Sequence, residues 1–234
     1  MQSDIKPKER PILLNAEMVR AVLDGRKTQT RRMLTSRHME LINLAARAGE
    51  CYPLESGQQH ENSQSYYREF CPFGAVGDRL WVREKTRVDL LLQHHRAHVR
   101  YEADGEYRIV SVPERIKPMV EGSCMSNGCY REASRITLEI TGVRVERLNS
   151  INEHDAIAEG LAEISKDGRT YKYGVPDPDG YPGTDDFGWP WHEWERYPIS
   201  AYSKLWKSIY GKGSWQANPW VWVIEFKRVE AEHA

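Results

Sequence analysis

A short basic segment is the most conspicuous chemical feature of this sequence. Residues 25–32 are Gly-Arg-Lys-Thr-Gln-Thr-Arg-Arg, which places four positive charges within seven residues. Arginine forks bind phosphate through paired hydrogen bonds, and a partly desolvated lysine can act as a base. The intervening hydroxyl and amide groups can hydrogen-bond a phosphate or a base edge. Most short charge runs are solvated loops, but this one leaves a predicted helix directly. We therefore predict a binding site for an anion, formed by Arg26, Lys27, Thr28, Arg31 and Arg32.

Two carboxylates are candidates to act with this basic segment. Glu159 is predicted to lie in the last turn of a helix, just before Gly160. A negative charge there is unfavourable against the helix dipole, which makes a functional role one explanation, although surface glutamates are common at such positions. Glu84 ends a predicted strand at 79–84. It is a candidate ligand-binding residue, and a cross-strand ion pair is the alternative.

Cysteine and histidine spacing gives no basis for a metal centre. Only Cys124 and Cys129 lie close together among the four cysteines, and their spacing is not that of paired Cys-x-x-Cys knuckles. His94, His95 and His98 could ligate a metal from a helix, but their polar stretch favours a solvated face. We predict neither a metal nor a cofactor.

Bulk composition limits where and how the protein works. The 234 residues carry a formal net charge of -1, so any anion-binding surface is local and not a general basic coat. No apolar run approaches the roughly 18 residues that span a bilayer. The polar N-terminal residues do not resemble a secretory signal. We therefore expect a cytoplasmic protein without a membrane partner.

Periodic patterns predict an α+β fold. Asn15 is a candidate N-cap and Gly25 a candidate C-cap for a helix over about 16–24. A Ser150-x-x-Glu153 capping box predicts a second helix that runs toward Gly160, and 199–209 has one apolar helical face. We expect a largely antiparallel barrel or curved sheet with helices at its ends. The predicted strands are 79–84, 97–102, 106–112, 134–145 with a bulge or bend at Gly142, and 219–229.

Two segments lack a clear pattern and are predicted to be insertions. Residues 33–70 show little periodicity and are expected to be partly mobile. Residues 164–198 are rich in Gly, Pro, Asp and aromatic residues. The tryptophans of the second segment could stack on bases, but packing against the rest of the domain is the favoured interpretation. These are Trp189, Trp191 and Trp194, whereas Trp220 and Trp222 are predicted to belong to the core.

The order of four segments resembles the ASCH domains, a branch of the PUA-like β-barrels. These segments are 25–32, Gly77-Asp78, 153–160 and 223–227. Residues 79–84 and 134–142 look particularly like those of larger phage- and prophage-encoded members. The resemblance covers about residues 10–229. It implies one PUA-like barrel with short flanking helices and the two insertions, between flexible termini at 1–9 and 230–234.

Within that superfamily, the Gly-Arg-Lys-Thr-x-Thr motif is similar to that of small N4-acetylcytidine amidohydrolases. The resemblance implies that Thr30 is the nucleophile, that Lys27 activates it, and that Glu159 relays protons. It also implies that Arg32 holds the substrate. In an ideal strand Lys27 and Thr30 would point to opposite faces, so this mechanism requires a turn or bulge between them.

The resemblance leaves the activity open, because other ASCH proteins are regarded as RNA binders and some as ribonucleases. The expected partners are RNA, DNA or a modified nucleoside. A binding module would use the arginines to hold a phosphate backbone. A metal-independent ribonuclease would use Lys27 and an arginine to stabilise the phosphorane without a covalent threonine. A purely structural phage component is a further alternative.

Overall fold

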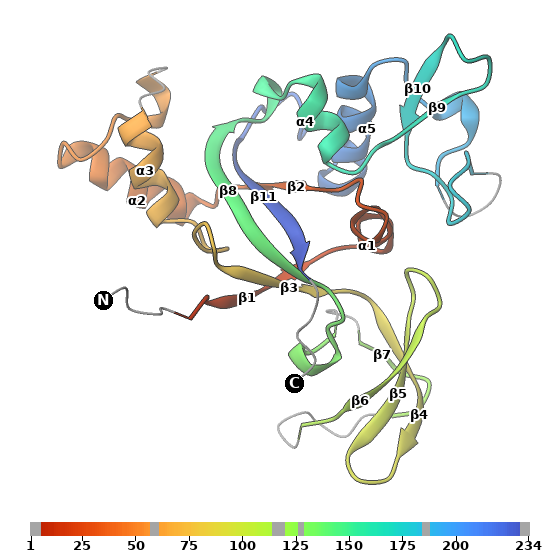
Figure 1. Cartoon of the computed structure of the whole chain (residues 1–234). Helices are drawn as coiled ribbons and strands as arrows, with labels where there is room; N and C mark the ends of the chain where they lie inside the picture. The colour runs from red at the N-terminus through yellow and green to blue at the C-terminus, as the bar shows by residue number, and fades with distance from the viewer. Residues whose placement is uncertain (1–5, 57–60, 114–119, 126–128, 184–187, 230–234) are drawn as a thin grey trace.

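The computed structural model describes residues 6–56, 61–113, 120–125, 129–183 and 188–229. It is an α+β protein built around a central five-stranded sheet of order β1-β3-β8-β11-β2 (Figure 1). These strands are β1 (Glu9–Leu13), β2 (Gln29–Met33), β3 (Arg79–Arg83), β8 (Thr137–Arg147) and β11 (Trp220–Val229). The helices are α1 (Ala16–Leu23), α2 (Ser36–Arg47), α3 (Glu61–Glu69), α4 (Glu153–Ala158) and α5 (Pro198–Tyr210).

Two smaller sheets extend from this centre. A four-stranded sheet of order β6-β5-β4-β7 lies below the central sheet in Figure 1, and a β9–β10 hairpin lies beside α5. Their strands are β4 (Thr86–Leu92), β5 (Arg96–Tyr101), β6 (Tyr107–Ser111), β7 (Cys124–Met125), β9 (Ala162–Ser165) and β10 (Tyr171–Gly174). Short 3-10 turns complete the order: η1 (Leu54–Ser56), η2 (Arg131–Ala133), η3 (Leu148–Ser150) and η4 (Trp191–Glu193).

The central sheet is curved but open. β11 pairs with β8 over ten residue pairs, and the register skips Thr141 beside Gly142, so the predicted bulge is confirmed. Among the described strands, β1 and β2 form the two edges, and the predicted closed barrel is not observed. α1 connects these edges and packs Val19 and Val22 into the core. A helix therefore fills the position where further strand pairing would close a barrel.

Alternation along β11 builds two cores, one on each face of the sheet. Trp222, Ile224 and Phe226 join the core covered by α1, α2 and α3. Val221 and Val223 join the core formed with α4 and α5. Each such side chain contributes roughly 1.5–3 kcal/mol through burial. The aromatic and β-branched C-terminal strand thus serves as the shared wall that the sequence predicts, with Trp222 fully buried.

Residues 33–70, which were predicted to be an insertion, are more regular than their sequence suggests. Instead of an irregular stretch, 33–70 forms α2 and α3, with residues 57–60 outside the described part. Thr35 caps α2 by accepting a hydrogen bond from the His38 amide. Ile42 and Tyr67 pack into the core. These helices gave little signal in the sequence because few of their residues are buried, so the apolar period is weak within a polar composition.

The second insertion packs against the domain, as favoured. Trp194 is 2% exposed, and its indole N–H donates to the Trp189 carbonyl at 2.7 Å. Trp189 itself packs against the core of α4 and α5. The described part of 164–198 forms β9, β10 and η4, and residues 184–187 lie outside it. Folding, not base stacking, accounts for Trp194.

Several boundaries differ from the predicted ones for local reasons. α4 is capped by Asn152 and not by Ser150, whose hydroxyl instead donates to the Arg147 carbonyl. His94 and His95 lie in the β4–β5 turn, not on a helix, because an unpredicted strand, β4, precedes them. The predicted flexible termini lie mostly outside the described residues, although Glu9 begins β1. The predicted α1, β3, α5 and β5–β6 hairpin are confirmed.

Candidate functional site

The basic segment is held by a turn between α1 and β2. Gly25 has φ +75°, a left-handed conformation that favours glycine. The Lys27 amide donates to the Ala21 carbonyl at 2.9 Å, and the Thr28 amide donates to the Ala158 carbonyl at 2.9 Å. These bonds fasten the segment to the ends of both α1 and α4. Lys27 therefore emerges directly beside Glu159.

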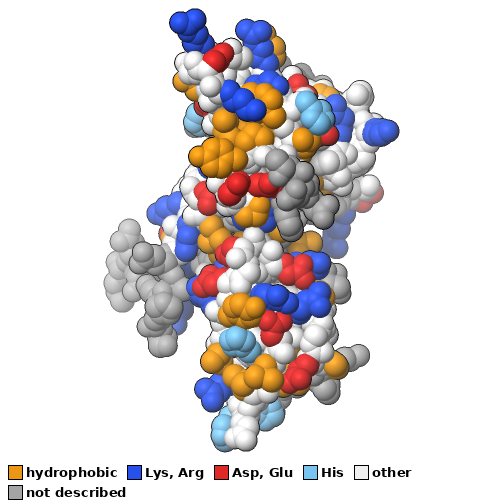
Figure 2. All heavy atoms as spheres, turned by 90° about the vertical axis from the view of Figure 1, so that its right-hand side faces the viewer, with side chains coloured by type: hydrophobic (Ala, Val, Ile, Leu, Met, Phe, Trp, Pro, Cys, Tyr) orange, Lys and Arg blue, Asp and Glu red, His pale blue; other side chains and the backbone are white. Residues whose placement is uncertain are grey.

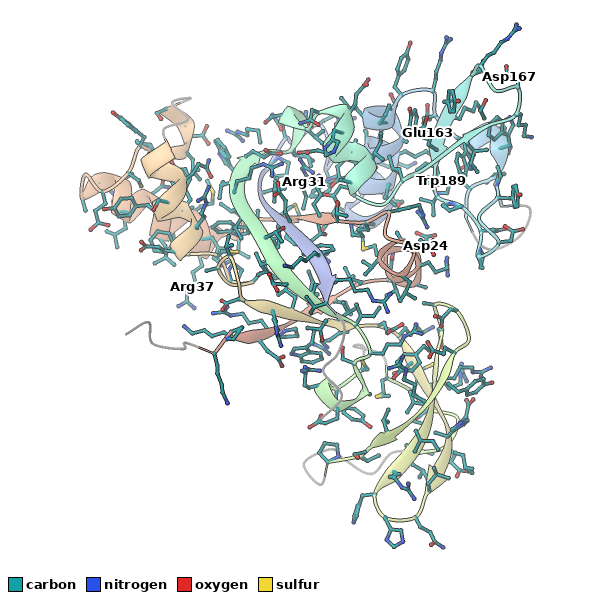
Figure 3. All side chains as sticks on the ribbon, viewed as in Figure 1. Asp24, Arg31, Arg37, Glu163, Asp167 and Trp189 are labelled. Carbon is teal, nitrogen blue, oxygen red and sulfur yellow. The ribbon has the colours of Figure 1, made fainter. Side chains whose placement is uncertain are left out.

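Lys27, Glu159 and Arg31 form one buried ion network (Figure 3 labels Arg31 between β2 and α4). The Lys27 ammonium donates to Glu159 Oε2 at 3.0 Å and to the Glu159 carbonyl at 2.8 Å. Arg31 donates to Glu159 Oε1 at 3.0 Å. The three side chains are 1%, 4% and 0% exposed, respectively, so solvent screens this network weakly. The carboxylate expected from the helix end does meet the lysine.

Further carboxylates complete the surroundings of Arg31. Its Nη2 donates to Glu146 at 2.6 Å and to Asp155 at 2.9 Å. Arg144 contacts the same two carboxylates from β8 and also pairs with Glu225. Arg31 thus has no exposed surface with which to reach a ligand. It positions Glu159 and the start of α4.

Burial changes the proton affinities of this network. Desolvation lowers the pKa of the Lys27 ammonium, and attraction to Glu159 only partly offsets this effect. Burial alone would raise the pKa of Asp155, but the hydrogen bond from Arg31 and the charge of Arg144 bring it below its ordinary value. Desolvation and the nearby Glu159 raise the pKa of the Tyr202 phenol, so that residue stays neutral. A lysine with reduced proton affinity is chemically suited to accept a proton.

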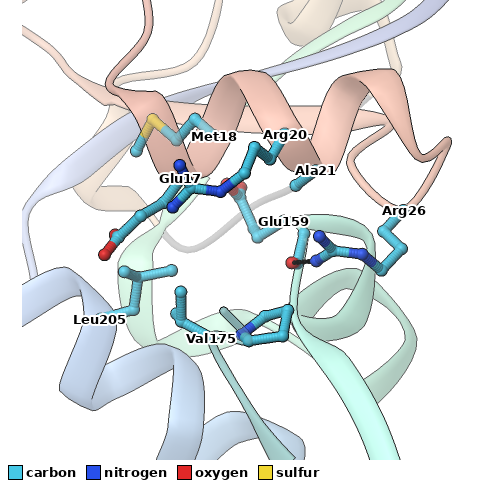
Figure 4. Close-up of a pocket in the computed structure, with 10 residues that line it drawn as sticks. Glu17, Met18, Arg20, Ala21, Arg26, Glu159, Val175 and Leu205 are labelled. Atoms are coloured by element: carbon cyan, nitrogen blue, oxygen red, sulfur yellow. Dashed lines mark hydrogen bonds between the residues drawn. The ribbon is translucent and has the colours of Figure 1, made fainter. Parts of the chain in front are cut away.

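A small pocket opens next to this network, between α1 and the chain that follows α4 (Figure 4). Its interior of about 20 Å³ holds about one water molecule. Arg26 lies at its side and donates to the Gly160 carbonyl at 2.6 Å and to Asp24 at 2.7 Å. The lining combines charged residues with an apolar wall: Glu17, Arg20, Arg26 and Glu159 opposite Val175, Pro176 and Leu205.

Thr30 lies on the other face of the sheet. It pairs with Ile224, whereas Arg31 pairs with Val223. Cross-strand partners point to the same side, and Ile224 and Val223 belong to different cores. Within the described ranges, no hydrogen bond joins Thr30 to Lys27 or Glu159. A mechanism with Thr30 as the nucleophile requires a turn that brings both Lys27 and Thr30 to Glu159. The observed turn lies before β2, so it brings Lys27 but not Thr30 to Glu159.

The remaining predicted residues are dispersed. Thr28 is exposed, and Arg32 is half-buried, donating to the Leu13 carbonyl at 2.7 Å. Glu84 is buried in a two-bond ion pair with Arg135, at 2.9 and 2.8 Å. An ion pair was the predicted alternative to a ligand-binding role for Glu84. It lies at the junction with the second sheet and not in the Lys27 network.

Sequence reasoning missed several members of the site. Arg144 and Glu146 alternate along β8 with the core residues Val143 and Val145. This alternation could have shown that both charged side chains lie on the face of β8 opposite those valines. Asp155 lies four residues before Glu159, so the two share one side of α4. Glu17 and Arg20 carry no comparable signal, because only the packing of α1 turns them toward the pocket.

No group of three or more His, Cys, Asp or Glu residues in the described ranges could hold a metal ion. None of the described helices is both long enough and apolar enough to cross a bilayer. No family model, curated protein or solved structure matches this chain.

Proposed function

We propose that the chain is a PUA-like domain of the ASCH type that binds a nucleotide-like ligand at the pocket beside Lys27. One observation carries this proposal: Glu159 lines the pocket while its carboxylate accepts from the buried Lys27. The ligand would meet charged groups on one side and an apolar wall on the other, which suits a base with polar edges. Because the interior is small, the base would lie across the mouth of the pocket.

Arg26 is the residue best placed to hold such a ligand. Its guanidinium has five N–H donors, and its hydrogen bonds to Gly160 and Asp24 leave the others for a ligand oxygen. Unlike Arg31, it retains exposed surface, with 24% of its side chain accessible. An anionic or carbonyl oxygen at the mouth would receive a charge-assisted hydrogen bond.

A direct test is calorimetric titration of the wild type with N4-acetylcytidine, cytidine and cytidine monophosphate. We expect Arg26→Gln to weaken binding roughly tenfold, since a hydrogen bond to a charged group contributes about 1.5–3 kcal/mol. Arg37→Gln is the matched control, because Arg37 is exposed and lies on the α2 side of the molecule, away from Asp24 and the pocket (Figure 3). Absence of binding to all three ligands, or equal affinity of Arg26→Gln and wild type, would count against the proposal.

Hydrolysis of an N4-acylated cytidine is a second candidate function, favoured by the Lys27–Glu159 contact. In this reaction a nucleophile attacks the acyl carbon, the C–N bond breaks, and the cytidine amine leaves with a proton. In the proposed step a water molecule in the pocket is the nucleophile, and Glu159, which lines the pocket, takes its proton and passes it to the leaving amine. The Lys27 ammonium holds the Glu159 carboxylate in place. Chromatography should then detect turnover that is lost in Lys27→Met and Glu159→Gln but survives in Thr30→Val. Loss in a well-folded Thr30→Val variant would favour the threonine nucleophile instead.

A further inference from the structure

The open face of the four-stranded sheet β6-β5-β4-β7, the second sheet of the molecule, exposes large apolar side chains. Leu90, Tyr107 and Ile109 are 48%, 48% and 57% exposed. Alternation places Val88, Val99 and other apolar residues on the covered face, so the opposite face would ordinarily be polar. Apolar surface gathered on one open face of a sheet indicates an interaction site.

The strand register aligns these residues in rows. Leu90 pairs with His98, and His98 pairs with Ile109, which gives one row across β4, β5 and β6. Arg100 pairs with Tyr107 in the adjacent row. The His98 and Tyr107 rings stack at 5.1 Å with an interplanar angle of 17°. Figure 2 shows hydrophobic and histidine side chains together on the lower half of the molecule, with both basic and acidic side chains beside them.

Arginines surround this apolar row, and their pairing is loose. Arg100 reaches Asp89 at 3.5 Å, and Arg87, opposite Arg100, reaches Glu102 at 3.9 Å. Arg96 lies in the next row and has no ion pair within the described residues. Positive charge on this face is therefore available to an external partner. We call these residues the platform: Leu90, His98, Tyr107 and Ile109, with Arg87, Arg96 and Arg100.

The turn at the end of the platform stores strain. His94 and His95 have φ of +60° and +53°, conformations that non-glycine residues adopt at a cost of about 1–3 kcal/mol each. Asn or Gly would relieve this cost. This turn places two exposed imidazoles next to Arg96 at the tip of the hairpin. At its other end the sheet meets α1, where Arg20 donates to the Ala103 carbonyl at 2.9 Å.

We propose that the platform binds a single-stranded nucleic acid. A base would stack on the outer side of the His98–Tyr107 ring pair, beside the Arg100 guanidinium, which lies 5.9 Å from the Tyr107 ring centroid. The backbone phosphates would pair with Arg87, Arg96 and Arg100. Aromatic platforms within a basic groove are the usual means of holding single strands. A polyanion is favoured over a protein partner because the charged side chains of the platform are all arginines, and the ion pairs of Arg100 and Arg87, at 3.5 and 3.9 Å, leave them available to phosphates. This inference goes beyond the pocket, because a free nucleoside does not need the platform.

Fluorescence anisotropy with labelled oligouridine RNA and oligothymidine DNA tests the proposal. Tyr107→Ala should weaken binding about tenfold through loss of stacking, whereas Tyr107→Phe should remain close to wild type. Arg100→Gln should reduce the dependence of log K on log salt by about 0.7, the value for one phosphate contact on a single strand. Tyr181→Ala is the matched control, since Tyr181 is 67% exposed but lies outside the platform.

Each outcome of these measurements either supports or overturns binding of a single strand at the platform. Tyr107-dependent binding of the RNA, the DNA or both supports the proposal. The proposal is overturned if the wild type binds neither oligonucleotide, or if Tyr107→Ala binds as tightly as wild type. Tyr107-dependent self-association in sedimentation, without oligonucleotide binding, would also overturn it in favour of a protein partner. Arg26→Gln should leave platform binding intact, so failure of the pocket proposal and failure of this one remain distinguishable.

Discussion

Two buried arginines form similar ion clusters in very different surroundings. Arg31 contacts Glu159, Asp155 and Glu146 between β2 and α4. Arg135 contacts Glu84 together with Asp104 and Glu106 of the β5–β6 turn. The second cluster also has the Tyr101 ring 4.2 Å from the guanidinium. Both contain a fully buried arginine, so burial of charge alone does not distinguish a functional site from a structural one.

What separates the two clusters is what else each contains. The Arg135 cluster joins the end of β3 to the second sheet, and every group in it has an opposite charge or a ring as its partner. Both clusters hold a second cation, but Arg108, which pairs with Glu106, is 43% exposed, whereas Lys27 is 1% exposed and shares Glu159 with Arg31. Glu159 also lines a pocket. A structural ion pair needs neither a buried second cation nor an opening. The Arg135 cluster is therefore the joint of two sheets, and the Arg31 cluster is the candidate site.

The largest expected effect comes from removing the cation of each cluster. Arg135→Met leaves Glu84 buried without its partner and should lower the free energy of unfolding by about 3–5 kcal/mol. Lys27→Met leaves Glu159 paired with Arg31 and removes a poorly solvated charge, so it should change stability by only about 1 kcal/mol. Urea denaturation of both variants measures the difference.

Ligand affinity should rank the same two variants in the opposite order from stability. Under native conditions Arg135→Met should bind the nucleoside as the wild type does, whereas Lys27→Met should lose affinity. If the two variants lost stability equally and bound equally, the distinction between joint and site would be wrong. Glu84→Gln combined with Arg135→Met should recover part of the lost stability, because the uncompensated charge is then absent.

Local patterns predicted which residues could meet, and long-range register decided which ones do. Lys27 and Glu159 could be named from a basic segment and a helix end, and the structure brings them together. The face of Thr30 depends on its pairing with Ile224, nearly two hundred residues later, which no local pattern specifies. Glu84 shows the same limit. Its strand was predictable, but its partner Arg135 comes from a segment that only the fold places beside it.

Two glycines with positive φ, one near each cluster, differ in how much space surrounds them. A methyl group at Gly160 would lie 2.9 Å from Ala21 Cβ and 3.1 Å from Lys27 Cβ, at φ +108°. Gly160→Ala should therefore lower the free energy of unfolding by roughly 1–3 kcal/mol and separate α1 from the site. Gly105, in the turn near Arg135, also has a positive φ of +74° but has open space around it.

The matched variant Gly105→Ala should consequently cost only the backbone strain of about 1 kcal/mol, and nucleoside binding should not change. Thermal melts rank the two variants, and calorimetry tests their binding. A Gly160→Ala protein with wild-type affinity would indicate that the contact between α1 and Lys27 does not shape the pocket.

The smallest expected effect is on the pH dependence of the free energy of unfolding, to which the two clusters should contribute with opposite signs. Burial raises the pKa of Glu84, and Arg135 only partly offsets this. Just above the ordinary value of about 4.3, the folded state retains a proton that the unfolded state has lost, so stability falls as pH rises. Asp155 has a lowered pKa. Below about pH 3.9 the unfolded state binds the extra proton, so its contribution to stability is lost as pH falls.

Unfolding free energies measured between about pH 3 and pH 6 therefore have different slopes in the two neutralised variants. Asp155→Asn should flatten the acid side of the profile, and Glu84→Gln should make stability rise more steeply above about pH 4.3. Neither change can exceed about 1.4 kcal/mol per pH unit, the limit for one proton. Slopes are compared because each substitution also alters stability directly. Identical slopes in the two variants would mean that the folded state shifts the pKa of Glu84 and that of Asp155 in the same direction, and the contrast between the two clusters would not hold.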